Sequence, residues 1–325
     1  MTKRIKFLDK RINEEIVKVM ANEQPRTLFE PAIYTLSMGG KRIRPLLTLM
    51  AVDLFGKNIE DAINPAIAVE IFHNFTLLHD DLMDNADIRR GNPTVHKKWD
   101  SNAAILSGDV MVVESYKYIS RVSSDLLPKI LTEFSNTAMD ICRGQQLDMD
   151  FEKRNDVTEA EYIYMIRLKT AVLLGCALKI GAIISKAPLN EVDALYDYGI
   201  NIGLAFQLKD DLLDVYGDPK TFGKNTGGDI LSNKKTYLLI KALENSNIKQ
   251  RGELEKWLTA EKYNPQEKIE AVKNIYDELK LKVIAEKLIE NYYLASLDCL
   301  SSINVPDIQK EGLIELSENL MYREK

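Results

Sequence analysis

Two copies of one acidic pattern, each set inside an apolar segment, most constrain how this chain can fold. Each copy has carboxylates at positions i, i+1 and i+4: Asp80, Asp81 and Asp84, then Asp210, Asp211 and Asp214. On a helix, the first and last of each triplet lie one turn apart on the same face. Like charges at that spacing cost a few tenths of a kcal/mol, and more where water is excluded. A single copy would more simply be a solvated helix end, but two copies favour a cation between them.

Apolar residues recur at helical spacing along almost the whole chain. We expect helices over residues 5–19, 29–38, 41–56, from Pro65 through the first triplet, from 101 onward, 158–184, 190–216 and from 235, then several shorter ones up to 325. Thr158 and Glu161 form a capping box that opens one of them. Residues 89–99 and 218–223 are expected to be loops. Because no alternating strand pattern or linker is evident, the sequence predicts an all-α fold with a single domain over 1–325.

The composition narrows the class of protein. The chain has 325 residues, 45% of them hydrophobic, which is enough for a substantial core. The longest apolar run, residues 171–184, is interrupted by Lys179 and is too short to span a bilayer. No signal peptide is evident, and a formal net charge of −6 argues against a nucleic-acid partner. The isolated cysteines Cys142, Cys176 and Cys299 are expected to be small buried residues in a reducing cytosol. We therefore expect a cytoplasmic protein.

The acidic stripes suit Mg²⁺, which takes one or two carboxylates and completes its shell with water and substrate phosphate. Gln207, Asp210, Asp211 and Asp214 follow i, i+3, i+4 and i+7, and His73, Leu77, Asp80 and Asp84 follow a matching stripe. If the two helices face one another, their acids could hold several Mg²⁺ ions around a diphosphate. Basic residues that could bind the same anion occur at expected turns, beside glycines: Lys41, Arg42 and Arg44 after Gly39-Gly40, Arg89-Arg90 before Gly91, and Lys224 after Gly223.

Alone, each of these basic residues would more simply be a solvated surface charge. Their position near the acidic triplets favours anion binding instead. Other phosphate and metal motifs do not fit. Five residues lie between Gly217 and Gly223-Lys224, where a P-loop has four. Three histidines without an HExxH pattern make zinc improbable, and no serine or cysteine triad is evident.

Taken together, the motifs resemble those of the trans-polyprenyl diphosphate synthases over essentially the whole chain. They occur in the family's order: Gly39 to Pro45, the first acidic motif with Arg89-Arg90-Gly91, Gly144-Gln145, Lys169-Thr170, and Phe206 through the second acidic motif to Gly223-Lys224. The resemblance implies an all-α isoprenoid-synthase bundle around a deep central cavity, usually a homodimer. It also implies a head-to-tail prenyltransferase that joins isopentenyl diphosphate to an allylic diphosphate.

The resemblance also implies roles for individual residues. Asp80, Asp84 and Asp210 would bind Mg²⁺, three ions with substrate bound, while Asp81, Asp211 and Asp214 would support them. The allylic diphosphate would be held by Arg89, Lys169, Thr170, Gln207 and Lys224. Isopentenyl diphosphate would be held by Lys41, Arg44, His73 and Arg90. The first motif lacks the two-residue insertion of many bacterial short-chain members, and the short basic tail puts a closing role for Arg323 in doubt.

Product length is expected to depend on Phe72, Phe75 and Thr76, which precede the first motif on the same helix. Phe75 is the fifth residue before the motif, where the resemblance implies an aromatic residue in members with short products. Ordinary core packing would explain both phenylalanines as well. We expect a C15 to C20 product, with a longer-chain synthase as the first alternative. A terpene cyclase and a non-catalytic partner subunit are the less favoured alternatives.

Overall fold

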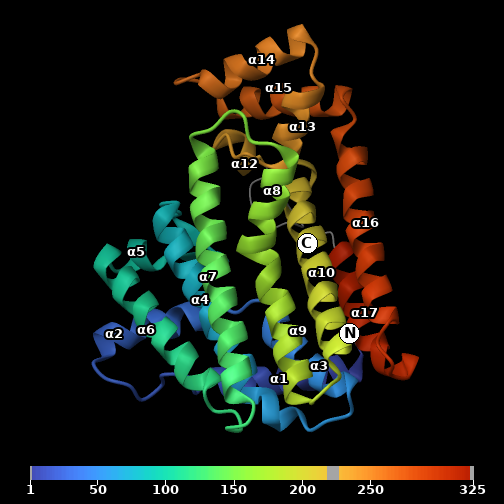
Figure 1. Cartoon of the computed structure of the whole chain (residues 1–325). Coiled ribbons are helices and arrows are strands. Elements are labelled where there is room, and N and C mark those ends of the chain that lie inside the picture. The colour runs from blue at the N-terminus through green and yellow to red at the C-terminus, as the bar shows by residue number, and fades with distance from the viewer. Residues whose placement is uncertain (1, 218–226, 323–325) are drawn as a thin grey trace. The chain divides into compact units, whose positions relative to one another are not determined.

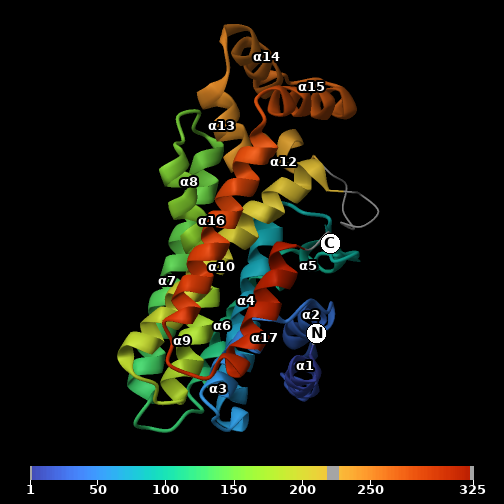
Figure 2. The ribbon, with the colours of Figure 1, turned by 90° about the vertical axis from the view of Figure 1, so that its right-hand side faces the viewer.

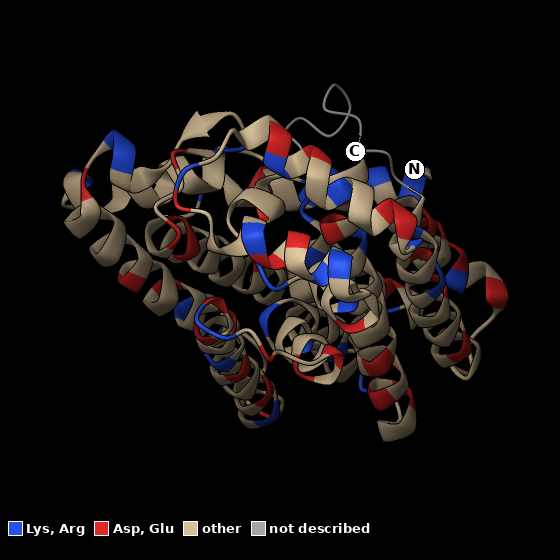
Figure 3. Cartoon of the chain, turned by 90° about the horizontal axis from the view of Figure 1, so that it is seen from above, with Lys and Arg blue, Asp and Glu red and all other residues tan. Residues whose placement is uncertain are grey.

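The computed structural model describes residues 2–217 and 227–322 and is built of helices. By its internal contacts the chain divides into two compact units. The first comprises residues 1–136, 173–196 and 303–313, and the second residues 137–172, 197–302 and 314–325. The predicted all-α class is confirmed. Figure 3 shows acidic and basic residues interspersed along the helices, so the negative charge is not confined to one segment.

The first unit contains the N-terminal helices. They are α1 (Lys3–Ile16), α2 (Arg26–Ser37), α3 (Ile43–Leu54), η1 (Ile59–Ala62), α4 (Ile63–Met83), α5 (Val95–Lys98) and α6 (Ser101–Ile119). Helix α4 packs against α6 and α3, and Figure 1 shows α4 beside α6. Gly108 of α6 permits this approach, because a Cβ there would lie 2.1 Å from Nε2 of His79. Ile67, Val69 and Ile71 are fully buried, each worth about 1.5–3 kcal/mol relative to exposure.

The second unit contains α8 (Glu159–Ile166), α12 (Gly228–Leu231), α13 (Tyr237–Asn245), α14 (Ile248–Thr259), α15 (Pro265–Glu278) and α16 (Leu281–Ser301). Helix α15 packs against α12, α14 and α16, and Figure 2 shows α13, α14 and α15 grouped together. Among the described residues, four helices have residues in both units: α7 (Leu127–Glu152), α9 (Val172–Ile184), α10 (Leu189–Tyr216) and α17 (Asp307–Met321). The second acidic triplet lies on the part of α10 that belongs to the second unit.

Several boundaries differ from the sequence expectations. The expected helix over 158–184 is three pieces, because a π-helical turn, Arg167–Ala171, separates α8 from α9. The expected capping box is confirmed, with both Thr158 and Glu161 hydrogen bonds present. Starts near Phe29, Lys41 and Lys235 are off by two or three residues, which is the usual uncertainty where end residues lack a strong cap. Only Cys176 of the three cysteines is buried; Cys142 is exposed, so its expected burial was wrong.

The expected loop over 89–99 is partly regular. Ile88–Arg89 (β1) pairs antiparallel with Asn92–Pro93 (β2), and α5 follows. Arg90 and Gly91 both have positive φ, 51° and 76°, as the two-residue turns of tight hairpins require. Two-residue strands are too short to show alternation, so no pattern in the sequence could reveal them.

Candidate active site

The first acidic triplet lies at the C-terminal end of α4, within the first unit. The helix ends there because Asn85 adopts φ 50°, and the Ala86 N–H donates to the Asp81 carbonyl at 2.9 Å. Asp84, the cap residue, is exposed and Asp80 is half-buried, whereas Asp81 is buried. The outer two carboxylates therefore lie at the surface of the helix end, and the middle one points inward.

Arg89 binds the buried member of this triplet. Its Nε and Nη2 donate to Oδ1 of Asp81 at 2.9 and 2.6 Å, and Nη2 lies 3.6 Å from Oδ2 of Asp80. Burial raises the pKa of Asp81, and the Arg89 guanidinium opposes that rise. The hairpin that carries Arg89 is thus tied to the acidic motif. The predicted role of Arg89 on the allylic diphosphate stays a prediction, since in this structure its guanidinium is bound to the motif itself.

A second cluster of basic residues lies in the same unit, around Gly39-Gly40. Arg90 donates to the carbonyl of Gly39, and its guanidinium covers Gly40, where a Cβ would lie 2.7 Å from Cζ. Nη1 of Arg44 lies 3.0 Å from Nε2 of His73. Burial lowers the pKa of His73 well below its usual value, and the arginines around it act in the same direction. A neutral His73 accepts the Arg44 hydrogen bond, which leaves this cluster strongly cationic.

The basic residues after the double glycine have different environments. Lys41 is exposed, whereas Arg42 is 6% exposed and its Nη1 donates to Oε1 of Glu70 at 2.6 Å. Glu70 also accepts from Nδ2 of Asn74 at 2.8 Å. Arg42 therefore ties the loop to α4 through a buried ion pair. Of the three, Lys41 and Arg44 remain the candidates for binding an anion.

The residues predicted to limit product length form part of an aromatic cluster. The Phe75 ring lies 5.3 Å from that of Phe72 and 4.8 Å from that of His79. Phe72 is 2% exposed and also contacts Phe134 of α7, with ring centroids 5.4 Å apart. Thr76 is half-buried and donates to the His73 carbonyl. Phe72 is thus a core residue, while Phe75 lies at the partly exposed edge of the cluster.

In the second unit, the buried member of the second triplet has its own partners. Tyr162 of α8 donates its hydroxyl to Oδ2 of Asp211, and Nε2 of Gln207 donates to Oδ1 at 3.0 Å. Oε1 of Gln207 accepts in turn from Thr170 at 2.9 Å. Burial raises the pKa of Asp211 to about 7, and the nearby Asp229 adds to the rise. As in the first triplet, the middle carboxylate is enclosed and the outer two, Asp210 and Asp214, are half-buried.

Lys169 belongs to the π-helical turn of the second unit, next to Thr170, which bonds Gln207. Nζ of Lys169 donates to Oδ2 of Asp148 at 2.6 Å. Gly144 of α7 lies against the turn, because a Cβ there would be 2.3 Å from the Lys169 backbone nitrogen. That close approach gives a physical reason for glycine in the Gly144-Gln145 motif. Lys169 and Thr170 lie near the second acidic motif, as their expected shared role requires, and the binding role itself stays a prediction.

Sequence reasoning missed four residues around the second triplet: Tyr162, Asp148, Asp229 and Lys234. Asp229 donates its backbone N–H to Oδ2 of Asp214 at 3.0 Å. Lys234 lowers the pKa of both Asp148 and Asp211 by its charge. Asp229 and Lys234 lie beyond the expected loop over 218–223, and no spacing in the sequence connects them with the second triplet. Lys224, Gly223 and Arg323 lie outside the described residues.

The donor atoms suit Mg²⁺, although neither triplet alone makes a metal site. In the described part of the chain, no group of three or more His, Cys, Asp or Glu side chains is gathered for a metal. Hard carboxylate oxygens at a helix surface nevertheless match an ion that takes only one or two protein carboxylates and otherwise binds water and phosphate. Asp80, Asp84 and Asp210 are the residues that would hold it.

Protonation of Asp211 predicts a pH-dependent stability. Its pKa is raised on folding from 3.8 to about 7, so its contribution to stability is largest below pH 3.8 and falls as the pH rises toward 7. In metal-free protein, we expect Asp211→Asn to remove part of the loss of stability between pH 4 and pH 7. The Tm at pH 7 should rise by a few degrees, roughly 2–4 °C for each kcal/mol of unfolding free energy gained. Thermal unfolding at pH 4 and pH 7 checks this. An equal shift at both pH values would contradict it.

Known proteins place these features in a family. The model of the polyprenyl synthetase family matches residues 25–279. A geranylgeranyl diphosphate synthase of Methanosarcina mazei is 40% identical over 242 residues, which are 74% of this chain and 75% of that protein. The geranylgeranyl diphosphate synthase of Sulfolobus acidocaldarius is 36% identical over 319 residues, 97% of this chain and 96% of that protein.

Solved structures agree. A crystal structure of a geranylgeranyl pyrophosphate synthase covers 100% of both chains with a TM-score of 0.95 and 45% identity. The geranylgeranyl pyrophosphate synthetase of Pyrococcus horikoshii covers 98% of this chain and 97% of that chain, with a TM-score of 0.92 and 31% identity. The chain belongs to the polyprenyl synthetase family. The predicted family, fold class and enzyme class are thereby confirmed.

Within the described residues, no helix is both long and apolar enough to cross a membrane.

Proposed function

We propose that this chain is a Mg²⁺-dependent prenyltransferase that condenses isopentenyl diphosphate head-to-tail with an allylic diphosphate. Its product is a short-chain polyprenyl diphosphate of C15 to C20. Within that range, we expect geranylgeranyl diphosphate. One observation carries the proposal: both triplets have the same arrangement, with the middle carboxylate enclosed and the outer two toward the surface. Several relatives named geranylgeranyl diphosphate synthase, 40–44% identical, support the product.

The chemistry follows from charge. When bound, Mg²⁺ neutralises the diphosphate leaving group as a Lewis acid. Lys169 and Gln207 orient the allylic diphosphate, so its C1–O bond can break with the electron pair leaving on the phosphate oxygen. Lys41, Arg44 and Arg90 hold isopentenyl diphosphate with its double bond toward C1, and that double bond attacks. The released diphosphate takes the proton lost from the new chain. Water has to be kept from the site during this step, because it would otherwise trap the cation.

The remaining expectations belong to the same proposal. The chain forms one catalytic domain over residues 1–325, and three Mg²⁺ ions bind together with substrate. It acts as a homodimer in the cytoplasm on its two diphosphate substrates, without a nucleic-acid partner.

One incubation separates the candidates. The purified protein is mixed with Mg²⁺, isopentenyl diphosphate and either dimethylallyl, geranyl or farnesyl diphosphate, and dephosphorylated products are separated by chromatography. We expect C15 to C20 alcohols, and none with EDTA. A cyclic hydrocarbon formed without isopentenyl diphosphate would identify a cyclase. Chains well beyond C20 would indicate a longer-chain synthase. Absence of any product with every primer would indicate a non-catalytic partner subunit.

Arg90→Ala tests the division of the two substrates. Because Arg90 lies on Gly40 beside the Arg44–His73 pair, we expect the KM for isopentenyl diphosphate to rise roughly 10–100-fold, the range for losing a hydrogen bond to a charged group. The KM for the allylic substrate should change little. Initial rates with each substrate varied in turn measure both constants, and Arg121→Ala, which removes an exposed arginine, is the control. Equal effects on both constants would contradict the assignment.

A further inference from the structure

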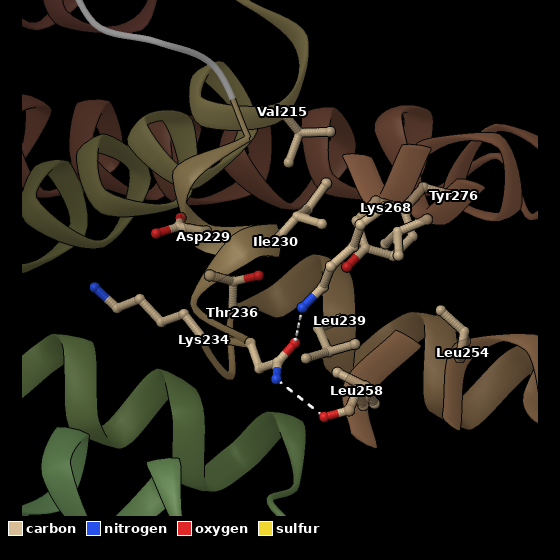
Figure 4. Close-up of a pocket in the computed structure, with 12 residues that line it drawn as sticks. Val215, Asp229, Ile230, Lys234, Thr236, Leu239, Leu254, Leu258, Lys268 and Tyr276 are labelled. Carbon is tan, nitrogen blue, oxygen red and sulfur yellow. Dashed lines mark hydrogen bonds between the residues drawn. The ribbon is translucent and has the colours of Figure 1, made fainter. Parts of the chain in front are cut away.

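Lys268 of α15 is a buried lysine that no step of the proposed reaction uses. It is 1% exposed, and its Nζ donates to Oδ1 of Asn233 at 2.7 Å and to the Leu231 carbonyl at 3.3 Å. Nζ also lies 4.3 Å from the centre of the Tyr263 ring. Figure 4 shows Lys268 among the residues that line a pocket, with its ammonium at one end of a dashed hydrogen bond. These partners are neutral, so the charge is buried against an amide, a carbonyl and an aromatic ring.

Burying an ammonium in this way is costly. A well-packed apolar side chain of similar size is often as stable or more stable than a buried charge. Burial lowers the pKa of Lys268, which shows that the charged form is disfavoured at this position. Lys268 is therefore not explained by stability alone, and its hydrogen bonds point to a geometry that has to be held.

Asn233, the main partner, occupies the turn between α12 and α13. Its φ is 56°, a left-handed conformation that asparagine tolerates better than most residues. Its Nδ2 donates to the Leu258 carbonyl at 3.1 Å, and its own carbonyl accepts from Nζ of Lys235 at 3.3 Å. With Lys268, these bonds tie the turn to α14, α15 and the start of the next segment.

The same turn carries two of the residues beside the second acidic triplet. The backbone N–H of Lys234 donates to the Asp229 carbonyl at 3.0 Å, and Asp229 in turn donates to Asp214. Figure 4 shows Asp229 and Lys234 extending away from Lys268, on the opposite side of the turn. Gly227, which donates to the Asp214 carbonyl at 2.6 Å, lies against Ile269, the neighbour of Lys268. Helix α15 therefore contacts the segment at both of its ends.

We propose that Lys268 is a positioning residue for the diphosphate site: by holding Asn233 and the Leu231 carbonyl, it fixes Asp229 and Lys234 beside the second acidic triplet. This rests on the proposed function, in which the second triplet lies at the allylic diphosphate; Lys234 adds a positive charge beside that triplet. Lys268 itself touches neither substrate nor metal. Its loss should therefore weaken binding of the allylic diphosphate group and leave isopentenyl diphosphate binding almost unchanged.

The test compares Lys268→Met and Asn233→Gly with wild type. Lys268→Met removes the ammonium but keeps an unbranched side chain, and Asn233→Gly keeps the left-handed turn but removes the amide. Lys262→Met, at an exposed lysine six residues earlier, is the control. Three properties are measured: the Tm by circular dichroism, the affinity for inorganic diphosphate with Mg²⁺ by calorimetry, and the KM for each substrate.

For Lys268→Met we expect an unchanged or higher Tm, about tenfold weaker binding of inorganic diphosphate and a similar rise in the allylic KM. Asn233→Gly should weaken diphosphate binding in the same way, but with a lower Tm, because it leaves the buried Lys268 ammonium without its main partner and also removes the bond to Leu258. In the double variant diphosphate binding should weaken little further, since both substitutions break the same Lys268–Asn233 hydrogen bond. Wild-type affinity in either single variant, additive effects in the double variant, or equal changes in both KM values would overturn the proposal. If Lys268→Met does not fold, Asn233→Gly decides. A wild-type chain that binds diphosphate but forms no product would overturn the proposed function instead.

Discussion

Asp210→Ala is expected to lower kcat by about 10²–10³-fold, the usual cost of losing one group that stabilises charge in a transition state. Asp210 is half-buried on α10, one turn before Asp214, and it is the member of the second triplet assigned to Mg²⁺. Asp80→Ala should have a comparable effect through the first triplet. Initial rates at saturating Mg²⁺ and both substrates measure the loss.

The fold should survive both substitutions. Removing a carboxylate from a cluster of like charges relieves repulsion, so the Tm without Mg²⁺ should be unchanged or raised. Asp298→Ala, at an exposed aspartate of α16, is the matched control and should retain wild-type kcat. If helical circular dichroism is lost together with activity, the acids are structural and the catalytic assignment is wrong. A kcat near wild type with a normal fold would equally exclude Asp210 from the reaction.

Phe75→Ala should lengthen the product, from C15–C20 in wild type to a distribution that includes C25 and longer chains. Phe75 lies five residues before Asp80, about 7–8 Å along the helix axis at the usual rise per residue. Its ring is at the partly exposed edge of the aromatic cluster, where removing it opens space without emptying the core. Chromatography of dephosphorylated products checks the result.

Phe72→Ala distinguishes chain-length control from core packing. Phe72 is almost fully buried between Phe75 and Phe134, so its truncation should destabilise the protein by about 3–5 kcal/mol. If Phe75 limits the chain, Phe75→Ala should change product length with little loss of Tm, and Phe72→Ala should mainly lower the Tm. An unchanged product length in Phe75→Ala would show that another residue ends the growing chain.

The sequence alone determined the helices and where they carry the acids. Apolar spacing and caps are local, so the predicted 190–216 helix is found over Leu189–Tyr216, and the Thr158 capping box is present. The motifs that resemble the polyprenyl diphosphate synthases identified the family because they involve short spacings along one chain. The helical placement of Asp80 and Asp210 followed from the same local rules.

Only the tertiary structure decided the partners of those acids. Asp211 accepts from Tyr162, 49 residues away, and Asn233 accepts from Lys268, 35 residues away. The π-helical turn at Lys169 and the hairpin at Arg90 also depend on neighbours distant in sequence, such as Gly144 and Gly40. Periodicity shows that a helix face is apolar or charged, but many partners satisfy the same face. Which of them lies within hydrogen-bonding distance is settled by packing, and that choice determines which carboxylates are enclosed and which lie toward the surface.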